Sequence, residues 1–166
     1  MGVDAKVEVA VPVRTAYDQW IQFESFPRFM PLVKKVIQLQ PTMTRWWVGR
    51  GPLRREFYAE IVEQHPDTLV AWRSLDRRIP HRGDVTFTSV DDHHAVVTVQ
   101  VELGSGLLAR LLHRPVQRMI NSQLAGFKTF IEGVGDAGET WRGTIRRGRV
   151  EHIEHEPPAH PGWAHG

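Results

Sequence analysis

Apolar residues follow two different spacings along the first third of the chain. Residues 7–11 alternate valines with Glu8 and Ala10, a period of two that predicts a half-buried strand. Residues 13–21 then carry apolar side chains at helical spacing, which predicts a short amphipathic helix after Pro12. Pro27 and Pro31 restrict their neighbours, so residues 23–33, FESFPRFMPLV, are expected to form one short helical turn or a lid.

Strand patterns occupy the following seventy or so positions. The candidate strands are 34–40, 44–50, 53–64, 68–75, 83–90 and 94–103. Turn-forming residues such as proline, glycine and aspartate separate them. Because the connections are short, successive strands are expected to pair antiparallel.

The apolar period changes to 3.6 after Gly104 and stays there to Ile131, which is the strongest helical pattern in the chain. Pro115 predicts either a short helix to residue 114 followed by a long one, or a kink. Gly133 and Gly135 are expected to end the helix. Residues 134–166 are rich in glycine, proline and histidine without an apolar period, which predicts a flexible tail after a domain at 3–133.

The order of these elements predicts an α+β fold in which a curved seven-stranded antiparallel sheet wraps around a long C-terminal helix. Two short helices follow the first strand. One helix cannot cover both faces of such a sheet, so strong curvature is the economical arrangement. A curved sheet around a single helix leaves a gap between them. The apolar segment 23–33 is placed in the sequence to cover one end of that gap.

The composition limits the classes of protein to which this chain can belong. The chain has 166 residues, 41% apolar and 24% charged, as expected for one globular domain with a tail. Its net charge of +2 gives no argument for specific nucleic-acid binding. The absence of cysteine excludes disulfides, zinc–thiolate sites and a cysteine nucleophile, and fits a cytoplasmic location. The sequence contains no run of 18 apolar residues, so no membrane span is predicted.

Four stretches together resemble a known superfamily. They are TAYDQWIQFESFPRFMPLVKKV (15–36), LRREFYAEIVEQHPDTLVAWRS (53–74), VTFTSVDDHHAVVTVQVEL (85–103) and LAGFKTFIE (124–132). In this order they resemble the SRPBCC, or START/Bet v1-like helix-grip, superfamily over residues 3–133. The likeness is to its bacterial polyketide cyclase/dehydrase-like group, related to coenzyme Q-binding START-like proteins.

The resemblance implies that an internal cavity binds a hydrophobic small molecule, such as a polyketide, an isoprenoid quinone or a lipid, without a cofactor. The alternative is a polyketide cyclase/dehydrase of the aromatase/cyclase type that acts on a bound polyketide. The expected cavity residues are Trp20, Phe26, Phe29, Trp46, Phe57, Trp72, Phe87, Val99, Met119 and Phe127. Core packing alone is the competing interpretation for each. Trp46 and Trp47 must face opposite ways on a strand, and the family pattern favours Trp46 inside.

Cyclase chemistry needs a donor beside a carbonyl and a base for a carbon-bound proton. The available candidates are His81, Tyr58, Arg73 and Gln123, which form no motif. Arg73 is also a candidate for an ion pair with Glu56 or Glu60 on the neighbouring strand.

Arginines recur on consecutive strands and their loops: Arg45, Arg50, Arg54, Arg55, Arg73, Arg77, Arg78 and Arg82. A solvated outer sheet face is the default interpretation. The alternative is a basic rim for an acidic head group, an acyl-carrier or other acidic protein, or anionic lipid. An interaction module that docks on a protein or ribosomal surface through this face is a third hypothesis. His152, His155 and His160 in the tail have neither the spacing nor the helix of a zinc site, so no metal is expected.

Overall fold

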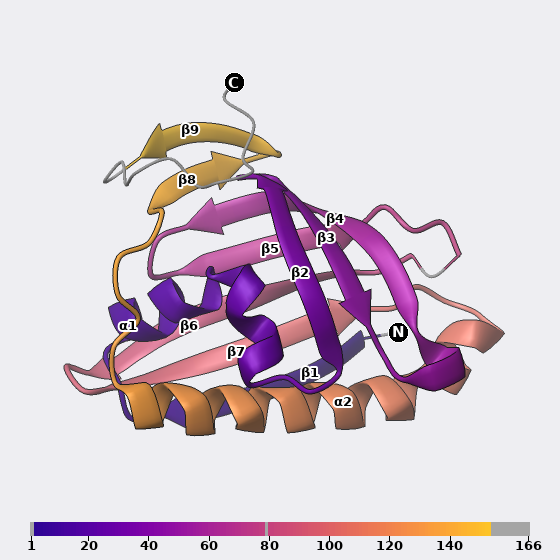
Figure 1. The fold of residues 1–166 in the computed structure, drawn as a ribbon, viewed down its shortest axis with the longest axis horizontal. Helices are drawn as coiled ribbons and strands as arrows, with labels where there is room; N and C mark the ends of the chain where they lie inside the picture. Colours follow the sequence, from indigo (N-terminus) through magenta and orange to yellow (C-terminus); the bar gives the residue numbers. More distant parts are fainter. Residues whose placement is uncertain (1, 79, 154–166) are drawn as a thin grey trace.

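The predicted strands form one antiparallel sheet in the computed structural model, which describes residues 2–78 and 80–153 (Figure 1). The strands are β1 (Gly2–Val9), β2 (Val33–Gln40), β3 (Met43–Val48), β4 (Arg55–His65), β5 (Leu69–Ser74), β6 (Arg82–Asp91) and β7 (His94–Glu102). Their order across the sheet is β1-β7-β6-β5-β4-β3-β2. Strands β2 to β7 therefore each pair with their neighbours in sequence, whereas β1 pairs with β7.

Two short helical elements follow β1, as expected: α1 (Val13–Trp20) and the 3₁₀ helix η1 (Phe23–Arg28). A second 3₁₀ turn, η2 (Gly51–Leu53), lies between β3 and β4. The long helix α2 (Leu107–Val134) continues through Pro115, so the prediction of two separate helices is wrong. Pro115 is exposed, and a solvated turn tolerates the one backbone hydrogen bond that proline removes.

The sheet curves over α2, so the predicted helix-grip architecture is confirmed (Figure 1). The C-terminal half of α2 carries its buried stripe, Ile120, Leu124, Phe127 and Ile131. Gly135, with φ 75°, caps the helix and its N–H donates to the Ile131 carbonyl at 2.8 Å. Residues 107–114 of α2 are mostly exposed, whereas the buried positions of the helix gather at 120–131.

Residues 143–153 depart from the predicted tail. They form two strands, β8 (Gly143–Arg146) and β9 (Arg149–Ile153), and β8 pairs with β4 at Gln64 and Glu63. The expectation of no regular structure after residue 134 is therefore wrong for this hairpin, and within the described residues the sheet has nine strands instead of the predicted seven. Ile145 alone supplies a fully buried apolar side chain there, so no period was visible in the sequence. Of the tail histidines, His155 and His160 lie outside the described residues.

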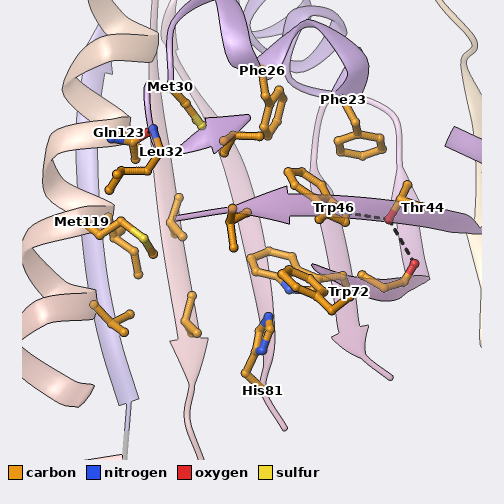
Figure 2. A pocket seen from close by; sticks show the side chains of 18 of the residues that line it. Phe23, Phe26, Met30, Leu32, Thr44, Trp46, Trp72, His81, Met119 and Gln123 are labelled. Atoms are coloured by element: carbon orange, nitrogen blue, oxygen red, sulfur yellow. Dashed lines mark hydrogen bonds between the residues drawn. The ribbon is translucent and has the colours of Figure 1, made fainter. Parts of the chain in front are cut away.

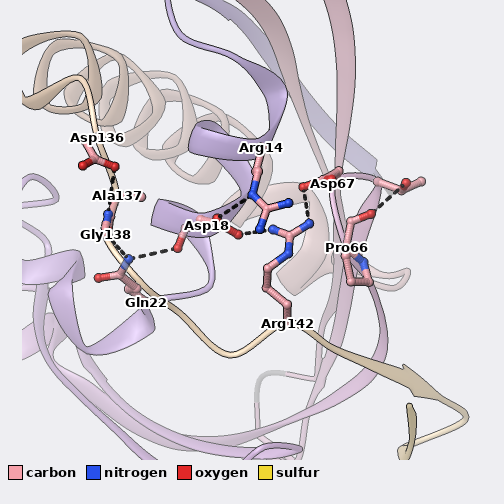
Figure 3. Close-up of polar contacts among 10 residues, drawn as sticks. Arg14, Asp18, Gln22, Pro66, Asp67, Asp136, Ala137, Gly138 and Arg142 are labelled. Carbon is pink, nitrogen blue, oxygen red and sulfur yellow. Dashed lines mark hydrogen bonds and ion pairs between the residues drawn. The ribbon is translucent and has the colours of Figure 1, made fainter. Parts of the chain in front are cut away.

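Residues 135–142, here called the strap, join α2 to β8 and cross α1 (Figure 3). Gln22 Nε2 donates to the Ala137 carbonyl in the strap at 2.6 Å. At the end of the strap, the Arg142 guanidinium donates to Asp18 of α1 and, at 2.8 Å, to Asp67 in the β4–β5 turn. One arginine thus joins three parts of the chain that are distant in sequence.

The Arg142 side chain is only 3% exposed, and Asp18 is nearly as buried. Its guanidinium lies 5.5 Å from the Tyr17 ring centre, so an aromatic face also contacts the charge. Burial raises the pKa of the Tyr17 hydroxyl, which stays protonated. Buried charges are tolerated when they are paired, and here two carboxylates meet one guanidinium.

Gly126 sets how closely α2 approaches η1. A Cβ atom at this position would lie 2.3 Å from the backbone oxygen of Phe29. Glycine-to-alanine changes inside helices normally stabilise by about 0.5–1 kcal/mol. We expect Gly126→Ala instead to lower the free energy of unfolding by about 1–3 kcal/mol in urea denaturation, because α2 must move away from η1.

Gly133 on the same helix is the matched control, because a Cβ atom added there would have no neighbouring atom within 4 Å. Gly133→Ala should leave the free energy of unfolding unchanged or raise it by up to about 1 kcal/mol. Equal stabilisation by both substitutions would show that the close approach at Phe29 is not a constraint.

Candidate functional site

A cavity of about 300 Å³ lies between the sheet and α2 (Figure 2). The period of two on β4 directs Phe57, Ala59 and Ile61 into it. From the helix side, Leu112, Val116, Met119, Ile120, Gln123 and Leu124 complete the wall. The interior between β4 and the middle of α2 is thus hollow, whereas a core of packed side chains lies beside it.

Aromatic side chains close one end of the cavity. Trp20 from α1 lies edge-on to Phe26 at 5.3 Å, and Phe26 contacts Trp46 of β3 at 5.5 Å between ring centres. Phe23 and Met30, which flank Phe26, are also buried and line the cavity. The apolar segment 23–33 therefore faces the interior and covers this end, as the sequence predicts.

The other end of the cavity is more exposed. The lining residues there are Arg55, Asp76, His81, Leu103 and Leu112, all exposed or half-buried. They come from β4, the β5–β6 connection, the β7–α2 junction and, for Leu112, α2 itself. Charged and titratable groups that border the cavity therefore gather at this open end.

Two polar side chains lie further inside. The Thr44 hydroxyl donates to the Ala59 carbonyl at 3.0 Å and accepts from Trp46 Nε1 at 2.7 Å (Figure 2). It is therefore used within the protein both as a hydrogen-bond donor and as an acceptor. Gln123, 8% exposed, accepts from the Leu32 N–H through Oε1 at 3.3 Å. The chain offers a guest in this region an apolar wall with few polar contacts.

The predicted cavity residues separate into two groups. Trp20, Phe26, Trp46, Phe57, Trp72, Val99 and Met119 line the cavity. Phe29, Phe87 and Phe127 are buried but do not line it, which corrects the prediction for these three. The physical reason for two of them is that α1 fills this part of the interior, where the Trp20 ring lies 5.0 Å from that of Phe127 and 6.3 Å from that of Phe87. Phe29 instead stacks on Phe130 of α2, with 4.7 Å between ring centres.

The acid–base candidates also separate. Tyr58 is 42% exposed on the outer sheet face, with the Arg45 guanidinium 5.4 Å from its ring centre. Arg73 lies on the same face, its Nε 3.5 Å from Glu60 Oε1. Both are therefore corrected as cavity groups, since the alternation of a strand turns them away from the interior. Only His81 and Gln123 of the four border the cavity, and the His81 ring lies 5.3 Å from that of Phe57.

Most arginines of the strands lie solvated on the outer face of the sheet. Arg45 pairs with Glu56 and lies 4.6 Å from the Trp47 ring centre, which places Trp47 opposite Trp46. Arg78 Nε lies 3.4 Å from Asp76 Oδ1. Arg54, Arg55 and Arg77 are exposed near the open end of the cavity. Some of the basic residues thus lie solvated on the outer face of the sheet, and others form part of the rim at the open end of the cavity.

Several cavity residues were missed from the sequence. Thr44 and Val48 alternate with Trp46 on β3, so period-two counting from that tryptophan would have found them. Val116 and Leu112 lie one and two turns before Met119 on α2, which is also a readable signal. Asp76 has no such pattern, because it lies in a connection between strands.

Neither a metal centre nor a membrane helix is seen in the part of the chain that the structure describes. No group of histidine and acidic side chains among residues 2–78 and 80–153 is arranged to hold a metal ion. None of the helices in these ranges is long and apolar enough to cross a bilayer.

Sequence comparison gives two matches over most of the fold. The family model described as polyketide cyclase/dehydrase and lipid transport matches residues 9–128. An uncharacterised 17.2 kDa protein of Streptomyces lincolnensis is 38% identical over 146 residues, 86% of this chain and 97% of that protein.

Solved structures share the fold at low sequence identity. The Zhui aromatase/cyclase from Streptomyces sp. R1128 matches with a TM-score of 0.68 and 16% identity, covering 84% of this chain and 98% of that one. A START superfamily protein from Mycobacterium smegmatis matches with a TM-score of 0.64 and 15% identity, covering 81% and 96%. These likenesses agree with the helix-grip architecture.

Proposed function

Because the chain belongs to the polyketide cyclase/dehydrase and lipid transport family, we propose that its cavity binds a hydrophobic small molecule such as a polyketide, an isoprenoid quinone or a lipid. One observation carries the proposal: a cavity of about 300 Å³ with almost entirely apolar walls, closed by aromatic residues at one end and open at the other. Pockets of this size and character are typical of small-molecule sites.

The apolar wall is large enough to hold such a guest. Burial of apolar surface contributes about 25 cal/mol per Å². A guest that buries roughly 250 Å² of apolar surface gains about 6 kcal/mol before the costs of association, which corresponds to a Kd on the order of tens of micromolar at best. Polar groups at the open end, His81 and Arg55 among them, would then orient the polar part of the guest.

The test is native mass spectrometry of the protein purified from its own host, followed by titration with the fluorescent probe anilinonaphthalene sulfonate. We expect a co-purifying lipid or aromatic molecule, or a probe that binds with enhanced fluorescence and competes with long-chain lipids. A protein that carries no guest and does not bind the probe would contradict the proposal.

The second candidate is a polyketide cyclase/dehydrase, favoured by the position of His81 at the cavity. There a ring nitrogen can exchange a proton with a bound carbonyl compound. Under this hypothesis, His81→Ala abolishes turnover of a polyketide while probe binding persists, and Gln123→Leu lowers turnover. Unchanged turnover in the His81 variant would rule out this role for the imidazole.

We also extend the proposal to a cytoplasmic location, which rests on composition alone, and to an acyl-carrier or other acidic protein as a partner. The support for such a partner is the set of exposed arginines near the open end, Arg54, Arg55 and Arg77. Capture of an acidic carrier protein that falls steeply with salt would support it.

A further inference from the structure

The first two turns of α2 present leucines to solvent. Leu107, Leu108 and Leu111 are 72%, 51% and 65% exposed. Single exposed apolar residues are common on protein surfaces, but neighbouring ones on one helix form a patch that often marks an interaction site. We call these three residues the leucine patch.

The leucine patch lies at the open end of the cavity. Leu108 and Leu112 are four residues apart and share a helix face, and Leu112 lines the cavity together with Met119. Leu103, just before the helix, lines it as well. Apolar surface therefore runs from the exterior of α2 to the cavity wall.

Exposed arginines surround the patch. Arg110, Arg114 and Arg118 repeat every four residues along α2 and therefore lie on one side of it. Figure 1 shows the start of α2, η2 and the β5–β6 connection at the same end of the molecule. This places Arg54, after η2, and Arg77, in the β5–β6 connection, near that end. Positive charge is concentrated here in a chain whose net charge is only +2.

We propose that this end of the molecule docks on an anionic lipid bilayer. The leucine patch enters the boundary between head groups and acyl chains, and the arginines face the lipid phosphates. A helix that mixes leucines with arginines on its solvent side has the composition of an interfacial helix, and anionic lipid complements its charge. A convex helical surface beside an apolar cavity also lets a guest move between bilayer and cavity without crossing water.

Co-sedimentation with vesicles tests the docking directly. We expect the protein to bind mixed vesicles of phosphatidylcholine and phosphatidylglycerol, and to bind phosphatidylcholine vesicles much less. Added salt should weaken binding to the mixed vesicles, because phosphate contacts are screened. The triple variant L107Q/L108Q/L111Q should lose about tenfold or more in vesicle partitioning.

Val90→Gln is the matched control, because Val90 is 53% exposed near the β6–β7 turn, away from the leucine patch. It should bind vesicles like the unchanged protein. Arg110→Gln with Arg114→Gln should weaken both the binding and its salt dependence, whereas Arg149→Gln in the β8–β9 hairpin should change neither. Equal vesicle binding by the triple variant and the Val90 variant would overturn the proposal.

Different experimental results would contradict the docking and the proposed ligand binding. Guest transfer rests on the proposed function, but vesicle binding does not. Probe binding in the absence of vesicles should be the same in the triple variant and the unchanged protein. Probe binding without any vesicle binding overturns the docking and leaves the cavity function in place. Salt-sensitive capture of an acidic protein by the same arginines, without vesicle binding, also overturns the docking.

Discussion

Replacement of Arg142 by methionine is expected to lower the free energy of unfolding by about 3–5 kcal/mol, because the buried Asp18 carboxylate loses its buried guanidinium and is left beside Arg14, an exposed arginine whose Nε lies 3.8 Å from Asp18 Oδ2. The same change releases Asp67 and the end of the strap. Urea denaturation followed by tryptophan fluorescence measures the effect. Of the substitutions considered, this one should affect stability most.

Two further variants show whether the cause is the loss of the buried partner of Asp18. Arg149→Met changes an exposed arginine of β9 and should stay within about 0.5 kcal/mol of the unchanged protein. Asp18→Asn combined with Arg142→Met should recover part of the loss, since it removes a buried carboxylate that only the exposed Arg14 side chain still faces among the ion pairs described for it. A loss below about 1 kcal/mol in Arg142→Met would mean that the ion cluster contributes little to the fold.

Ala59→Phe should abolish most guest binding while the protein stays folded. Ala59 is 2% exposed and faces the cavity from β4, so a phenyl ring there occupies the space that a guest needs. Loss of roughly 100 Å² of apolar contact costs about 2.5 kcal/mol, close to a hundredfold in Kd. The measurement is titration with anilinonaphthalene sulfonate, together with the midpoint of thermal unfolding.

The stability of this variant separates a filled cavity from a damaged core. A side chain that enters a cavity avoids most of the usual overpacking penalty of about 1–3 kcal/mol, so the unfolding midpoint should hold or rise. Val62→Phe, further along the same strand, is the control, because Val62 does not line this cavity. Full probe binding in Ala59→Phe would show that the probe binds elsewhere.

The strands and their inward faces were readable from local patterns. A period of two fixes which side chains of a strand share a face, so the interior position predicted for Phe57 is shared by Ala59 and Ile61. The same rule separates Trp46, at the cavity, from Trp47, beneath Arg45. Adjacent aromatic residues on one strand are thus informative even without a structure.

Long-range partners were not readable. Asp18 and Arg142 are 124 positions apart, and the local sequence around either residue does not predict that it pairs with the other. Phe87 and Phe127 have the character of cavity residues, but α1 packs against them, and sequence spacing does not show which part of the interior a short helix fills. The strand β8 was missed because its pairing partner β4 is distant in sequence, and β9 in turn pairs with β8.

The uneven burial of α2 locates where the interior is easiest to reach. The buried stripe of the helix lies in its second half, whereas its first turns carry mostly exposed side chains and border the open end. Pro115 cannot donate to the carbonyl one turn earlier, which weakens the join between the two halves. Transient fraying of those first turns would widen the opening while the sheet stays intact, so exchange of a guest need not await global unfolding.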